Sequence, residues 1–76
     1  MKFSYDKLKG KIKECFGTQD AFAKALGMSR ATLSIKLNNS SEFSQNEIFK
    51  AMKLLKLSQS DVDEYFFTLK VKKTEQ

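Results

Sequence analysis

The sequence predicts an all-α fold, a compact bundle of about five short helices. Its 76 residues include no proline and only three glycines, which disfavours a turn-rich β fold. Apolar residues recur at helical spacing, and residues that favour helix N-caps precede several of these runs. With 41% hydrophobic residues the chain can form a core, and its length suits one domain.

The first two predicted helices are separated by a short break. The first spans residues 4–16, and Gly17 is suited to end it because glycine adopts positive φ without strain. Thr18 is the expected N-cap of the second helix, and Gly27 is expected to end that helix. Cys15 is expected in the core or at its boundary, since a single cysteine cannot form an internal disulfide. The predicted core side chains of the two helices are Leu8, Ile12, Phe16, Phe22, Ala23 and Leu26.

Three further helices are expected after Gly27. Ser29 should cap the third helix, whose core residues are Leu33 and Leu37. Ser44 and Glu47 form a predicted capping box for the fourth, which continues through Phe49, Met52 and Leu55, and Ser58 with Asp61 begins the fifth. Val62, Tyr65, Phe66 and Leu69 are the apolar residues assigned to the fifth helix. The predicted domain covers residues 1–68, and the tail, residues 69–76, fits strand periodicity and a frayed helix end equally.

The segment from Gln19 to Asn38 carries the clearest motif. Gln19, Ala23 and Gly27 follow one another at intervals of four residues. Ser29, the expected cap of the next helix, and the aliphatic Leu33 complete the motif. In this arrangement the sequence resembles the lambda-repressor-like helix-turn-helix family of small phage regulators, the Cro and CI type. The resemblance implies that the second and third helices form a central helix-turn-helix motif. It also implies that the third helix enters the major groove of double-stranded DNA.

The third helix therefore supplies most of the expected DNA contacts. Its outward face should carry Ala31, Thr32, Ile35 and Asn38, with Ile35 placed to contact a thymine methyl group. Arg30, in the first turn, can form two hydrogen bonds to a guanine. Where the family usually has an aliphatic residue this chain has Lys36, which is expected to reach a phosphate. The remaining expected backbone contacts are Gln19, which resembles the family's phosphate-binding glutamine, Ser34 and Asn39.

The charge pattern is compatible with a nucleic-acid partner. Residues 1–38 carry eight basic and three acidic side chains, whereas residues 39–76 carry six of each. The positive half can face phosphates or simply be solvated. With no histidine and a single cysteine, neither a metal site nor a cofactor is expected, and we predict no enzyme activity, no small-molecule substrate and no membrane span. The expected location is the cytoplasm of a bacterial host, in association with the nucleoid.

Two functions remain open at this point. The first is a Cro-like repressor that binds a palindromic operator as a weak homodimer. The second is an antirepressor or modulator that uses the same fold to bind another regulator, with Ile35 in a protein-binding patch. The homodimer interface is expected where apolar side chains exceed the needs of a small core. These residues are Tyr65, Phe66, Phe67, Leu69 and Val71.

Overall fold

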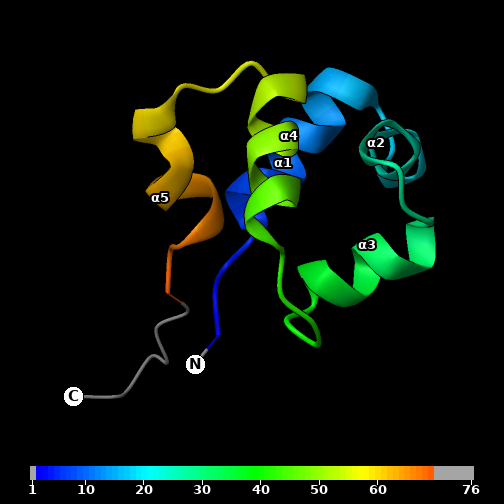
Figure 1. Ribbon diagram of the computed structural model, residues 1–76, viewed down its shortest axis with the longest axis horizontal. Coiled ribbons are helices and arrows are strands. Elements are labelled where there is room, and N and C mark those ends of the chain that lie inside the picture. The colour runs from blue at the N-terminus through cyan, green and yellow to red at the C-terminus, as the bar shows by residue number, and fades with distance from the viewer. Residues whose placement is uncertain (1, 70–76) are drawn as a thin grey trace.

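The computed structural model describes residues 2–69, which form the predicted all-α bundle. The helices are α1 (Asp6–Phe16), α2 (Gln19–Leu26), α3 (Arg30–Leu37), α4 (Gln45–Leu54), the short 3₁₀ helix η1 (Gln59–Asp61) and α5 (Val62–Phe66). Helix α5 lies on one side of α4, and α2 and α3 lie on the other (Figure 1). Helix α1 packs against both α2 and α5, so it connects the two sides of the bundle.

The predicted starts of α2, α3 and α4 are confirmed by hydrogen bonds, whereas the predicted cap of the fifth helix, Ser58, begins η1 and α5 starts at Val62. The Thr18 side chain accepts a bond from the backbone of Ala21, and the Ser29 side chain accepts one from Thr32. Ser44 and Glu47 form the predicted capping box, at 3.1 and 2.9 Å. Each cap satisfies backbone N–H groups that a helix start leaves without a partner. These local bonds explain why the helix starts could be predicted from short segments.

The core is formed by one cluster to which α1–α5 all contribute. Its largest fully buried side chains are Phe22, Phe66, Leu8, Ile12, Leu33 and Leu55. Phe16 packs at the edge of the cluster with its ring 5.2 Å from that of Phe22. Cys15 is exposed, and its predicted burial is wrong. The buried face of α1 follows the row Tyr5, Leu8, Ile12 and Phe16, and Cys15 lies beside that row.

The two ends of the described chain meet. Helix α1 begins two residues later than predicted, because Ser4 donates a backbone hydrogen bond to Thr68 at 2.6 Å. Phe3 and Leu69 form an isolated antiparallel bridge next to this bond. The pairing ends α5 at Phe66 and favours the strand interpretation up to residue 69, while the rest of the predicted tail lies outside the described residues.

Candidate functional site

The turn between α2 and α3 has the geometry that the motif predicts. Gly27 lies in the left-handed region with φ 86°, and the next residue, Met28, donates a backbone bond to Ala23. Only a glycine adopts this backbone without strain. Ala23 is completely buried, as is Leu33 on α3, so the two helices can approach closely. The turn and these core side chains determine the direction in which α3 leaves α2.

The outward face of α3 is exposed as expected. Arg30, Ala31, Thr32 and Asn38 are exposed, and Ile35 retains 47% of its accessible surface. This face therefore offers a guanidinium, a hydroxyl, an amide and an apolar side chain to a partner. Together they can donate and accept hydrogen bonds and contact an apolar group, which suits a base edge or a protein surface alike.

The start of α2 lies next to the start of α3. Gln19, which is half-buried, and Arg30 line one hollow together with Thr18 and Asp20. The backbone N–H groups at the start of α2 favour an anion there, whereas Asp20 opposes one. The structure thus brings together two of the predicted contact residues that are eleven positions apart in the sequence.

The structure corrects the role predicted for Lys36. Its side chain is buried, and its ammonium donates to the backbone oxygen of Glu42 at 2.9 Å. It also forms an ion pair with Glu47 at 3.2 Å. Burial raises the pKa of Glu47, but hydrogen bonds from Ser44 and the charge and hydrogen bond of Lys36 outweigh this effect and leave that pKa lowered. Lys36 therefore holds α3 to the start of α4 and is not placed to reach a phosphate.

Asn39 is likewise engaged within the fold. Its side chain accepts a hydrogen bond from the Phe3 backbone at 2.9 Å and donates one to it at 2.8 Å. Its backbone has φ 67°, a conformation that asparagine tolerates better than most residues. Asn39 therefore anchors the N-terminal segment, and its side chain is withdrawn from the predicted phosphate contacts. Ser34 is half-buried on α3, and its predicted contact with a DNA phosphate stays a prediction.

The predicted homodimer residues separate into two groups. Phe66 is 1% exposed and belongs to the core, where its ring meets Phe43 at 5.4 Å, so its assignment to an interface is wrong. Tyr65 is half-buried against the same core. Phe67 and Leu69 are exposed, at 45% and 46%, and remain available to a partner. Val71 lies outside the described residues.

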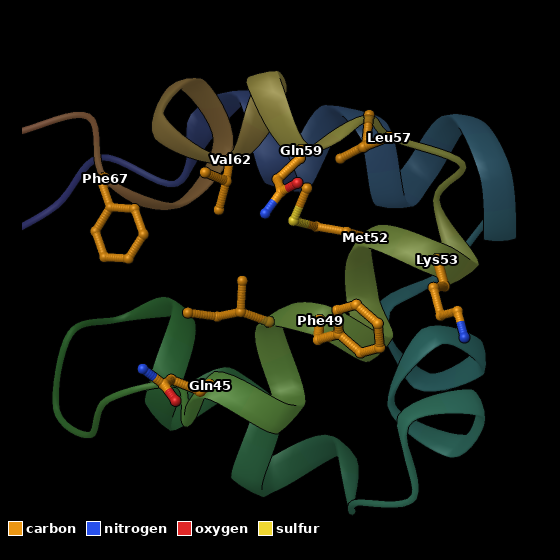
Figure 2. Close-up of a pocket in the computed structure, with 9 residues that line it drawn as sticks. Gln45, Phe49, Met52, Lys53, Leu57, Gln59, Val62 and Phe67 are labelled. Atoms are coloured by element: carbon orange, nitrogen blue, oxygen red, sulfur yellow. The ribbon is translucent and has the colours of Figure 1, made fainter.

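A groove between α4 and the η1–α5 segment was not predicted. Figure 2 shows Gln45 and Phe49 of α4 facing Leu57, Gln59 and Val62 across it, with Phe67 at one end. The groove encloses about 480 Å³. Phe49 is the most exposed large apolar side chain among the described residues, at 62%. The lining also includes Ile48, Met52 and Lys53.

Helical spacing could have revealed this exposure. Ile48, Met52 and Leu55 recur at the spacing of one buried row on α4, and Phe49 lies beside that row. The sequence pattern predicts that Phe49 belongs to the same apolar run as Met52 and Leu55. In the structure Met52 and Leu55 are buried, whereas Phe49 points toward the groove (Figure 2).

Two negative findings apply to residues 2–69. Every helix there is too short or too polar to cross a lipid bilayer. Over the same range, no three His, Cys, Asp or Glu side chains are grouped so that they could bind a metal ion.

Comparisons with known proteins give the class of this chain. Residues 1–69 match the model of a family described as "Protein of unknown function (DUF739)", and the chain belongs to that family. A search of curated proteins found no match. Among solved structures, the chain is similar to the modulator of repression (MOR) of the temperate bacteriophage TP901-1 from Lactococcus lactis, determined in solution. The two share 44% sequence identity with a TM-score of 0.78, over 95% of this chain and 97% of that one.

Proposed function

We propose that this chain is a small phage regulator that modulates repression by binding another regulatory protein. The observation that carries this proposal is the 44% identity to a modulator of repression, over nearly the full length of both chains. Exposed apolar side chains on α3, on α4 and after α5 are compatible with a protein partner. The proposed setting is the cytoplasm of the bacterial host of a temperate phage or a related element, and we propose no catalytic role.

A second candidate function is direct, sequence-specific DNA binding. In this proposal α2 and α3 form a lambda-repressor-like helix-turn-helix motif, and a Cro-like repressor reads an operator through the outward face of α3. The exposure of Arg30, Thr32, Ile35 and Asn38 favours it, as does the excess of basic residues in the first half of the chain. With Phe66 buried and Val71 not described, a homodimer of this kind would rely on Phe67 and Leu69.

One pair of measurements separates these functions. The purified chain is titrated calorimetrically with the repressor of the same phage or mobile element, and is mixed in a gel shift with the DNA upstream of its own gene. Saturable binding to the repressor, with no shift of DNA by the chain alone, supports a modulator. A salt-sensitive DNA shift that Arg30→Ala abolishes, without binding to the repressor, would support the DNA-binding candidate and overturn the main proposal.

A further inference from the structure

The groove between α4 and α5 combines apolar lining with a single charge. Among the described residues that line it, only Lys53 is charged, at the end of α4. The Lys53 ammonium lies 5.1 Å from the centre of the Phe49 ring, a cation–π contact at an exposed site. No carboxylate within residues 2–69 forms an ion pair with Lys53. An occupant with apolar side chains and a nearby anion would complement this lining.

The exposed face of α4 extends the same pattern. Asn46, Phe49, Lys50 and Lys53 are the exposed residues that follow its first residue, and none of them is acidic. The acidic residue of α4, Glu47, is half-buried and bonded to Lys36, so it does not offset this charge. The Lys50 ammonium donates to the Leu26 backbone oxygen at 3.4 Å and so points away from the groove. On its α4 side the groove is therefore bordered by the Lys53 charge, which favours a carboxylate of a partner at that position.

This charge argues against two other occupants. A second copy of the chain that docked through the same groove would bring its Lys53 toward Lys53, which opposes association. Nucleic acid would match the lysines, but its phosphates gain nothing from contact with Phe49, Met52 and Val62. A protein segment that carries both apolar and acidic side chains matches both features of the groove.

We infer that the groove formed by Phe49, Met52, Lys53, Leu57 and Val62 binds a short apolar segment, flanked by carboxylates, of a partner protein. An apolar side chain of that segment lies between α4 and α5, and a carboxylate pairs with the Lys53 ammonium. This inference rests on the proposed function for the identity of the partner, which is the regulator that the chain modulates. The groove between α4 and α5, and not the outward face of α3, is then the protein-binding surface.

The first test uses a matched pair of short helical peptides. One carries two leucines a helical turn apart flanked by glutamates, and the other has lysines in place of the glutamates. Each is titrated into the isotopically labelled full chain, and amide and methyl shifts are followed by NMR. We expect the acidic peptide to shift the signals of Phe49, Met52 and Val62, and the basic peptide to bind at least tenfold more weakly. Equal binding of the two peptides, shifts confined to α3, or no shifts would overturn the inference.

Variants then connect the groove to the regulator. Phe49→Ala should weaken binding of the repressor about tenfold, since a central aromatic side chain often dominates an interface. Lys53→Glu should weaken it further and reverse the preference between the two peptides. Lys13→Glu is the matched control for Lys53→Glu, because it reverses an exposed charge outside the groove. Ile35→Ala removes the exposed apolar side chain of α3 and so tests the competing surface.

The outcomes separate the groove from the proposed function. If the unmodified chain does not bind the repressor, the proposed function fails, and the peptide pair alone decides whether the groove binds acidic apolar segments. If the repressor binds but Ile35→Ala weakens it and Phe49→Ala does not, the modulator function stands and the groove inference is wrong. Phe49 shifts that grow with protein concentration alone would identify a second copy as the occupant and also overturn the inference.

Discussion

Replacing Glu47 by alanine should destabilise the fold by about 3 kcal/mol, because two separate contacts are lost. One is the capping-box bond that the Glu47 carboxylate accepts from the Ser44 backbone at 2.9 Å. The other is the ion pair with Lys36 at 3.2 Å. In the variant the Lys36 ammonium, whose side chain is only 11% exposed, keeps the Glu42 backbone oxygen as its partner.

The magnitude follows from the two losses. A helix cap contributes about 1 kcal/mol. A buried charged donor that loses a partner costs roughly 1–3 kcal/mol. The total stays at the lower end of the range of about 3–5 kcal/mol for breaking a buried ion pair, because the Glu47 side chain is 28% exposed. Replacing Lys36 by methionine should cost less, about 1 kcal/mol, because an apolar side chain of similar length fills the same space without an unpaired charge.

Urea unfolding followed by circular dichroism measures these effects. We expect the double variant Lys36→Met, Glu47→Ala to be more stable than Glu47→Ala alone, by roughly 1–2 kcal/mol, because it leaves no buried ammonium without its carboxylate. Two results would show that the ion pair does not stabilise the fold as described. One is a change in unfolding free energy in the double variant that equals the sum of the two single changes, and the other is a loss below about 0.5 kcal/mol for Glu47→Ala. A Lys36→Met variant with unchanged stability and lost DNA binding would also contradict it, because this is the behaviour of a phosphate contact.

Three further predictions concern acid stability, the N-terminal anchor and the α2–α3 turn. Because the folded state lowers the pKa of Glu47 below its ordinary 4.5, the stability it adds is present above that pH and is lost as the pH falls through the lowered value. Glu47→Gln should therefore flatten the loss of stability in acid, and an unchanged pH profile would contradict this. Asn39→Ala should cost about 2 kcal/mol and speed amide hydrogen exchange at Phe3, since two hydrogen bonds disappear; unchanged exchange there would show that the anchor is unimportant. Gly27→Ala should lower stability by about 1–2 kcal/mol through its backbone alone, because an added Cβ would meet only the Lys50 ammonium, at 3.8 Å; equal urea midpoints would contradict it.

Local signals predicted the bundle well. Thr18, Ser29 and Ser44 cap helices by bonding to residues three positions away, so a short segment contains both partners. Gly27 marks the turn for a similar reason, since its effect depends on its own backbone conformation. The outward face of α3 could also be predicted, because Leu33 and Leu37 fix the buried side of a short helix.

Contacts between distant residues account for the errors. Lys36 is buried because its partner, Glu47, lies on another helix, and a helical wheel of α3 alone cannot reveal that pairing. The many apolar residues around Phe66 predict an interface there. In the structure Phe66 is buried because its ring packs against Phe43 and because α5 packs against α1. Helical spacing places Phe49 beside the buried row of α4, but the groove that Phe49 lines depends on how far α5 lies from α4, which no local pattern encodes.

The proposed function requires that this chain acts on a regulatory protein and does not itself read an operator. A nuclease footprint of the upstream DNA tests it most directly, with the repressor alone, with the chain alone and with both. We expect that the chain alone protects no site, that adding it changes the repressor's footprint, and that Arg30→Ala leaves this change intact. A palindromic footprint made by the chain alone and lost in Arg30→Ala, with the repressor's footprint unaffected, would show instead that the chain is a DNA-binding repressor.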